Sequence, residues 1–223
     1  KRENIVGQKH LSIPLPAELY GQLRANSKGL DLANDSALIH LNQTAQQFAK
    51  HQWSAAPMGE HIQTNDAVAP QSIINPARHS DVVGYVQEAT TEQVEQALNN
   101  AQAVQDIWAR TAKDTRASYL LRAADLMEAR LEELMVLLCR ESGKTYANAI
   151  AEVREAVDFL RYYATQMIDL DANAEVEPLG TMLCISPWNF PLAIFTGQVA
   201  AALVAGNTVI AKPAEQTPLI AAQ

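Results

Sequence analysis

One stretch, residues 178–218, constrains the fold more than any other part of the chain, because it predicts a strand, a turn, a helix and a second strand in close succession. Residues 181–185 form a short apolar run between Gly180 and a Ser-Pro pair, which is typical of a strand buried on both faces. Residues 208–211 form a second such run. Two strands joined by one helix predict a parallel pair in an α/β sheet.

The helix between the two strands has recognisable ends. Asn189 is placed to cap it, and Pro191 suits its first turn, where a missing amide hydrogen does no harm. Gly206 and Asn207 mark its end, after a run of small and apolar residues. We therefore expect strand, helix and strand to follow one another with little intervening loop.

Polar side chains follow both strands at the point where each strand ends, which is where open α/β sheets bind ligands. Glu215 is placed like the acidic residue that accepts hydrogen bonds from ribose hydroxyls in dinucleotide folds. The glycine-rich phosphate loop of those folds is absent, and a proline-rich turn stands in its place. The sequence therefore excludes an ordinary Rossmann phosphate grip at this turn. The polar residues after the two strands are Ser186, Trp188, Asn189, Lys212, Glu215 and Gln216.

Two motifs carry a family resemblance. Residues 186–191 read Ser-Pro-Trp-Asn-Phe-Pro and residues 212–218 read Lys-Pro-Ala-Glu-Gln-Thr-Pro, which resemble the paired signatures of NAD(P)-dependent aldehyde dehydrogenases. The resemblance covers about residues 72–223. It implies the N-terminal part of that α/β fold, with helices and the first strands of a Rossmann-like parallel sheet, and it implies that the chain is a piece of a longer polypeptide.

One branch of the superfamily fits best. Residues 141–145, 151–163 and 185–197 look like the glutamate semialdehyde dehydrogenase domain of the bifunctional proline utilisation A proteins. Residues 20–32 resemble the segment that joins the proline dehydrogenase domain to it in those proteins. The resemblance thus divides the chain into a linker or arm over residues 1–57, a boundary over 58–71 and the start of the NAD-binding domain over 72–223.

The resemblance also implies roles for individual residues. Asn189 matches the side-chain amide that donates to the developing oxyanion, and Phe190 matches a residue of the aldehyde tunnel. Lys212 and Glu215 match contacts to the adenosine ribose, and Glu215 would repel a 2′-phosphate, which favours NAD over NADP. The residues expected to line the cofactor cleft are Ile185, Ser186, Pro187 and Trp188.

The activity implied is oxidation of L-glutamate γ-semialdehyde to L-glutamate by NAD, through thiohemiacetal and thioester intermediates. The family's nucleophilic cysteine, general-base glutamate and pyrophosphate loop match positions beyond residue 223, so we expect the chain alone to be inactive. FAD is expected only in a preceding proline dehydrogenase domain, and the whole protein is expected to form a homo-oligomer. The alternatives are another semialdehyde substrate, such as succinate semialdehyde, and a non-catalytic scaffold of the same fold.

Composition excludes several other classes. A net charge of −8 without a Lys/Arg cluster argues against nucleic acid contact by this segment. The longest apolar stretch, residues 192–205, is too short for a membrane span. The five histidines all precede residue 80 without ligand spacing, so no metal site is expected. Cys139 and Cys184 lie in apolar surroundings, which predicts reduced, structural thiols and a cytoplasmic protein.

The remaining periodicity predicts mostly helices. Residues 36–49 predict a helix in the arm, residues 72–76 and 81–86 predict a hairpin, and three helices are expected over 91–108, 114–142 and 145–168, with Gly143 ending the second. Gly143-Lys144-Thr145 is no phosphate loop, because Leu138 stands where that motif needs glycine. In the last helix Glu152, Glu155 and Asp158 predict a solvated face; the alternative is contact of one carboxylate with a substrate ammonium group.

Overall fold

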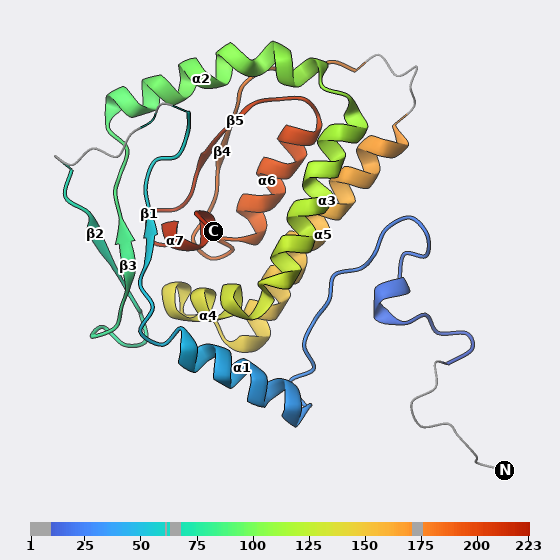
Figure 1. Cartoon of the computed structure of the whole chain (residues 1–223), viewed down its shortest axis with the longest axis vertical. Helices are drawn as coiled ribbons and strands as arrows, with labels where there is room; N and C mark the ends of the chain where they lie inside the picture. Colours follow the sequence, from blue (N-terminus) through green and yellow to red (C-terminus); the bar gives the residue numbers. More distant parts are fainter. Residues whose placement is uncertain (1–9, 61, 63–67, 171–175) are drawn as a thin grey trace.

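A three-stranded sheet forms one side of the molecule (Figure 1). The computed structural model describes residues 10–60, 62, 68–170 and 176–223. The predicted hairpin is confirmed as β2 (Gln71–Ile74) and β3 (Val82–Val86), which pair antiparallel. A further strand, β1 (Trp53–Ala55), was not predicted; it pairs parallel to β3 and completes the order β1-β3-β2. Gly84 allows this approach, because a Cβ there would lie 2.1 Å from the carbonyl oxygen of Trp53.

Four helices follow where three were expected. α2 (Thr91–Arg110) begins with a capping box in which the side chains of Thr90 and Gln93 each bind the other residue's backbone amide. The predicted second helix is in fact two, α3 (Lys113–Ala129) and α4 (Leu131–Ser142), which are separated by Arg130 at φ −106° and ψ 17°. Tertiary packing explains the break, because α3 packs along α5 (Tyr146–Asp169) whereas α4 also contacts α1, β3 and α7.

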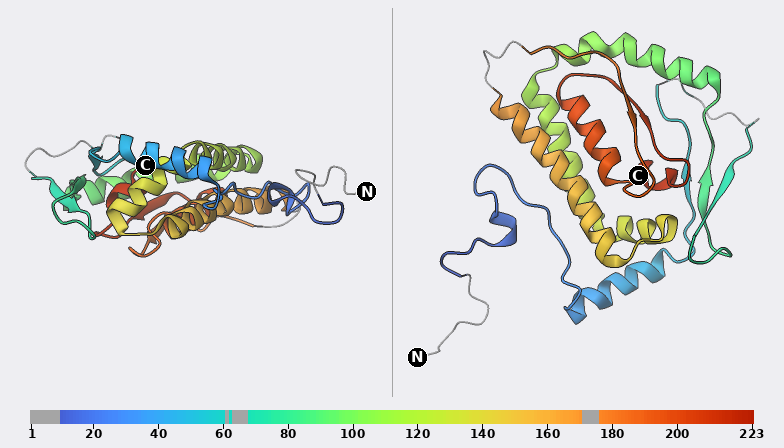
Figure 2. Two further views of the ribbon diagram at one scale, coloured as in Figure 1. Left: turned by 90° about the horizontal axis from the view of Figure 1, so that it is seen from below. Right: turned by 180° about the vertical axis from the view of Figure 1, so that it is seen from behind.

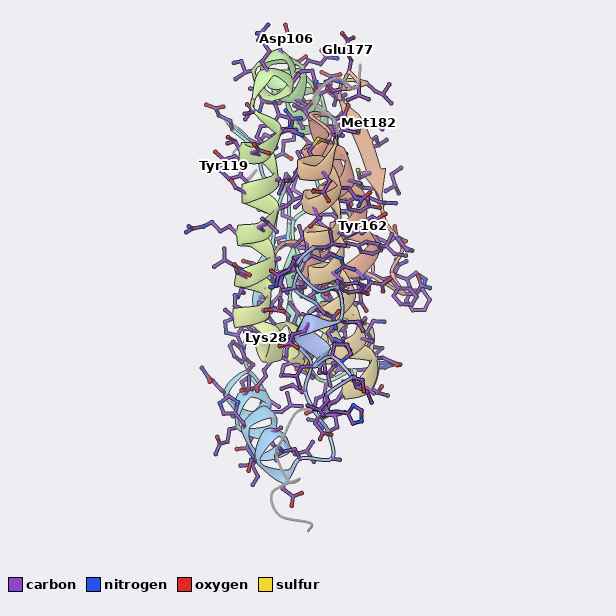
Figure 3. All side chains as sticks on the ribbon, turned by 90° about the vertical axis from the view of Figure 1, so that its right-hand side faces the viewer. Lys28, Asp106, Tyr119, Tyr162, Glu177 and Met182 are labelled. Carbon is purple, nitrogen blue, oxygen red and sulfur yellow. The ribbon has the colours of Figure 1, made fainter. Side chains whose placement is uncertain are left out.

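The core lies between these helices. Small residues where α3 meets α5 let the two backbones come close, and larger side chains of α4 fill the space beyond them. Tyr119 of α3 points away from the side of the molecule that carries Met182 (Figure 3). No helix in the described ranges is long and apolar enough to cross a bilayer. Fully buried members of this core include Ala117, Ala124, Met135, Leu137, Leu138, Ala149, Val153 and Ala156.

The last part of the chain forms the predicted strand, helix, strand unit. It comprises β4 (Met182–Ile185), α6 (Ala193–Val204), β5 (Val209–Lys212) and α7 (Pro218–Ala221), with β4 and β5 parallel. Both face-on views place this unit in the middle of the molecule, framed by α2, the three-stranded sheet, α4 and the α3–α5 pair (Figure 2).

Burial of β4 on both faces is a wrong prediction. Cys184 is buried, but Leu183 and Ile185 are 63% and 57% exposed. The reason is that α6 packs against the two strands, whereas nothing in the described part of the chain covers the face that carries Leu183 and Ile185. One face and one edge of β4 are therefore open.

The N-terminal arm is fixed to the helices at two places. α1 (Asp35–Gln47), which is capped by the side chain of Asn34, inserts Leu41 into the core against α4. Between the short helix η1 (Pro16–Glu18) and α1, the arm is held by Asp158 of α5, which accepts hydrogen bonds from the Arg24 side chain and from the Ser27 amide and hydroxyl. Figure 3 shows Lys28 beside the same helices. The division of the chain into arm, boundary and domain stays a prediction.

Candidate functional site

The site begins where β4 and β5 end. Ile185 is paired with Lys212, and the amide of Ser186 donates to the carbonyl of Lys212 at 3.2 Å. Parallel pairing therefore brings the two polar segments predicted from the sequence to one edge of the sheet, as expected. The exposed side chains at this edge are Ile185, Trp188, Asn189, Phe190, Lys212 and Glu215.

The side chains proposed to bind cofactor differ in their surroundings. Pro187 is half-buried, and Ser186 is 5% exposed with no hydrogen-bond partner for its Oγ among the described residues. Lys212 Nζ lies 3.1 Å from the carbonyl oxygen of Pro213, and Glu215 accepts a hydrogen bond from the side-chain amide of Gln216 at 3.0 Å. An ammonium group and a carboxylate thus stand exposed after β5, where they can meet a polar ligand.

Asn189 does not cap α6. The helix begins at Ala193, its N-cap residue is Leu192, and no side chain of the turn itself binds its first amides. Asn189 lies in a bend four residues earlier, exposed, and no hydrogen bond of its side chain is found within the described ranges. The capping explanation for this asparagine is therefore wrong, and its amide is available to a ligand.

Glu152 of α5 takes over the capping of α6. Its Oε1 accepts hydrogen bonds from the amides of Leu192 at 2.8 Å and Ala193 at 3.4 Å. Glu152 is 1% exposed, so the expectation of a solvated face is wrong for this residue. Glu155 is exposed as predicted, and Asp158 is half-buried against the arm.

Lys144 completes this arrangement from the start of α5. Its Nζ lies 2.7 Å from Oε2 of Glu152 and donates to the backbone carbonyl of Asn189 at 2.8 Å. It also lies 4.8 Å from the centre of the Phe190 ring, within the range of a cation–π contact. One lysine therefore contacts the carboxylate that caps α6 and the two residues at the tip of the turn.

Comparison with known proteins assigns the chain to a family. The model of the aldehyde dehydrogenase family matches residues 62–223. The chain belongs to the aldehyde dehydrogenase family. It is 56% identical to the bifunctional protein PutA of Escherichia coli over all 223 residues, which are 17% of that protein. It is 39% identical to the 1-pyrroline-5-carboxylate dehydrogenase of Anoxybacillus flavithermus over 85% of the chain and 38% of that protein.

Solved structures of the family share this fold. A 1-pyrroline-5-carboxylate dehydrogenase from Thermus with bound NAD matches with a TM-score of 0.82 and 32% identity, over 88% of the chain and 41% of that protein. A bifunctional proline utilisation A structure matches with a TM-score of 0.74 and 37% identity, over 95% and 19%. The chain is thus a partial aldehyde dehydrogenase fold that spans about a sixth of the length of the PutA relatives.

The geometry gives a physical reason why this aldehyde dehydrogenase turn has no Rossmann phosphate grip. Pyrophosphate binding at a helix N-terminus needs free amide donors and tolerates no fixed negative charge beside them. In α6 the amides of Leu192 and Ala193 bind Glu152, that of Ile194 binds the carbonyl of Phe190, and Pro191 has no amide hydrogen. A carboxylate from the protein itself therefore occupies the place of a phosphate.

A second helix N-terminus is closed in the same way. Glu141 of α4 accepts hydrogen bonds from the amides of Leu219 at 2.6 Å and Ile220 at 2.9 Å in α7. Burial raises the pKa of Glu141 to about 7, against the opposing effect of these two hydrogen bonds. Between Glu141 and Lys144, Gly143 ends α4 at φ +70°, a conformation that glycine adopts without strain.

Neither cysteine is a credible nucleophile. Burial raises the pKa of the Cys139 thiol to about 11 and also raises that of Cys184, so both remain protonated at neutral pH. This supports the structural role predicted for both. No cluster of three or more metal-ligating side chains is found in the described parts of the chain.

Sequence reasoning missed Lys144, Glu152 and Glu141. Lys144 lies two residues before the first residue of α5, so helical spacing gives no signal for its contact with Glu152. Glu152 stands between Ala149 and Ala156, whose small side chains leave room for a neighbouring backbone. These small neighbours are the sequence feature that could have indicated the burial of Glu152.

Proposed function

We propose that this chain supplies the cofactor edge and the oxyanion donor of an NAD-dependent dehydrogenase that oxidises L-glutamate γ-semialdehyde to L-glutamate in proline catabolism. The observation that carries the proposal is that the exposed Asn189 amide follows β4 and the exposed Lys212 and Glu215 lie at the end of β5, two parallel strands that end together. The relatives named 1-pyrroline-5-carboxylate dehydrogenase support the substrate, and the Thermus relative with bound NAD supports the cofactor.

The residues at the sheet edge fit NAD in their chemistry. Glu215 can accept hydrogen bonds from both ribose hydroxyls, Lys212 can donate to them, and the negative charge of Glu215 disfavours a 2′-phosphate. Ile185, Pro187 and Trp188 offer an apolar wall, whereas the Oγ of Ser186 is buried. When bound, NAD accepts the hydride.

Asn189 has the chemistry of an oxyanion donor, and Phe190 would border the aldehyde path. An amide donor aimed at the place where negative charge develops accelerates the reaction, and losing one such donor lowers turnover by about 10² to 10³. We place the nucleophilic cysteine and the general base outside this chain, because burial keeps both of its cysteines protonated. The chain by itself is therefore inactive.

We also place this domain in a larger assembly. The description of the PutA relatives as bifunctional supports a second activity, a proline dehydrogenase that holds FAD, in the same polypeptide. The arm that runs along α3 and α5 would connect the two, and the complete protein would form a homo-oligomer. The acidic chain carries no nucleic acid contact in this proposal.

The test uses a chimera in which this chain replaces the 223 matching residues of Escherichia coli PutA. NAD reduction with glutamate semialdehyde is measured for the chimera, for its Asn189→Ala variant and for a matched Asn148→Ala variant, since Asn148 is an exposed asparagine on α5. We expect Asn189→Ala to lower kcat by about a hundredfold or more with little change in the KM for NAD, and Asn148→Ala to change neither.

The controls separate the alternatives. The unmodified host protein shows that the assay works, succinate semialdehyde tests the other substrate, and the purified chain alone is expected to reduce no NAD. An inactive chimera with a folded, active host would favour a scaffold role for this chain. Unchanged turnover in Asn189→Ala would remove the oxyanion role.

A further inference from the structure

The turn that carries Asn189 has few contacts of its own that could fix its position. Trp188, Asn189 and Phe190 form a bend with exposed side chains, and no side chain within the turn caps the helix that follows. An oxyanion donor is effective only where its position is set before the reaction, since a displacement of about 1 Å can lower the rate about a hundredfold. Something outside the turn must therefore hold it.

We propose that Lys144 and Glu152 form a positioning pair that holds the Asn189 amide in place for the reaction proposed above. Lys144 Nζ donates to the backbone carbonyl of Asn189 at 2.8 Å, which fixes the peptide unit directly after its side chain. The same ammonium lies 4.8 Å from the centre of the Phe190 ring. Both residues at the tip of the turn thus share one cation.

Glu152 connects this cation to the helix. Its Oε2 lies 2.7 Å from Lys144 Nζ, while its Oε1 binds the first two amides of α6. One carboxylate therefore links the tip of the turn to the helix that follows it. The Glu152 side chain is 0% exposed and that of Lys144 is 13% exposed, so solvent does not weaken the pair as it would at the surface.

The two side chains of the pair come from a well-packed part of the fold, which keeps the pair rigid. Glu152 belongs to the N-terminal half of α5, and Lys144 lies two residues before that helix. α5 is itself packed against α3, α4 and α6. The position of Asn189 is thus set by α5 and by the turn before it rather than by its own loop.

A first test needs no enzymatic activity. The chain contains three tryptophans, of which Trp188 adjoins Asn189 while Trp53 and Trp108 lie elsewhere in the fold. Labelling with 5-fluorotryptophan gives three ¹⁹F resonances, which single Trp→Phe variants assign. We expect the Trp188 resonance to shift or broaden in the double variant Lys144→Met/Glu152→Gln, and the Trp53 resonance to stay in place.

Two matched variants separate positioning from mere stability. Lys113 also donates to backbone carbonyls, those of Ile168 and Leu170, but at the far end of α5, so Lys113→Met removes a comparable contact without touching the turn. We expect it to leave the Trp188 resonance unchanged. Lys144→Arg keeps a cation that can donate to both partners, and we expect it to restore most of the wild-type spectrum.

The second test is kinetic and uses the chimera. The double variant is expected to lower kcat about tenfold or more while the KM for NAD changes by less than about twofold, with Lys144→Arg between it and wild type and Lys113→Met unchanged. The double variant removes both charges together and so leaves no buried charge unpaired. The kinetic measurement can therefore still be made if Lys144→Met alone does not fold.

The outcomes distinguish the two proposals. An unmodified chimera without activity contradicts the proposed function, whereas the fluorine spectra still report on the pair. If the Trp188 resonance is unchanged in the double variant, the positioning role is contradicted. The same holds if kcat falls equally in Lys113→Met. Either result leaves the proposed function intact.

Discussion

The N-termini of α6 and α7 each bind a buried carboxylate, but the negative charge of that carboxylate is balanced differently at the two sites. Each receives a buried glutamate from another helix, Glu152 and Glu141, which binds two backbone amides. Glu152 has an ammonium group 2.7 Å away, whereas the pKa of Glu141 is raised to about 7 because burial is offset only by the two amides. The comparison shows that helix amides alone do not compensate a carboxylate for the loss of water.

Removing the Lys144 ammonium group beside Glu152 should have the largest effect on stability. Lys144→Met leaves the carboxylate of Glu152 fully buried without its partner, which we expect to lower the free energy of unfolding by about 3–5 kcal/mol. Urea unfolding of the chain measures this loss. The double variant Lys144→Met/Glu152→Gln should recover most of it, and a single variant that loses under about 1 kcal/mol would show that the pair is not needed.

Glu141, which binds the N-terminus of α7, should instead affect how the stability of the chain depends on pH. The pKa of Glu141 is about 7 in the folded chain against an ordinary value of 4.5 for glutamate, so between these pH values the folded state binds more protons than the unfolded state. Stability from this group is therefore present at pH 4.5 and below, and is lost as the pH rises through about 7. The full loss is roughly 3 kcal/mol, at 1.36 kcal/mol per pH unit.

Comparison with a Glu141→Gln variant isolates this effect. Other carboxyls act in the opposite direction at lower pH, because arginine side chains lower the pKa of Asp81 and Glu133. We therefore measure unfolding free energies between pH 5 and 8, where the wild type should lose stability and Glu141→Gln should lose much less. Glu152→Gln leaves Glu141 in place and should keep the wild-type slope. Equal slopes in wild type and Glu141→Gln would contradict the prediction.

A smaller effect is expected at the turn between the two sites. Gly143 has φ +70°, and a Cβ there would lie 3.1 Å from Cγ of Pro76, so Gly143→Ala should destabilise the chain by about 1–2 kcal/mol. Gly21 has φ +59° with open space around it, and Gly21→Ala therefore measures the backbone strain without the contact. Thermal unfolding of both variants compares them, and an equal loss would mean that the Pro76 contact relaxes freely.

The order of the elements near the site could be predicted because it depends on local signals. The apolar runs around Cys184 and Ile210 predicted the parallel pair, and Gly143 marked the end of a helix, where it has a positive φ angle. Those signals act within a few residues and do not depend on the rest of the fold. The placement of the predicted site residues at one sheet edge followed from them.

The parts that could not be predicted depend on contacts between distant segments. The helix break at Arg130 has no proline or glycine beside it and reflects the different partners of α3 and α4. β1 is three residues long and exists through its pairing with β3. Glu152 is buried and Asn189 does not cap α6 for the same reason. The carboxylate from α5 accepts hydrogen bonds from the backbone amides that the asparagine would have bound.

Caps supplied by another helix also bear on how the chain folds. The capping box of α2 belongs to the helix itself and can form as soon as that helix forms. The first turns of α6 and α7 gain their acceptors only when α5 and α4 have docked. Secondary and tertiary structure are therefore acquired together in these two helices, and the amides of Leu192 and Leu219 should exchange their hydrogens only in larger cooperative openings, whereas the end of α2 can fray alone.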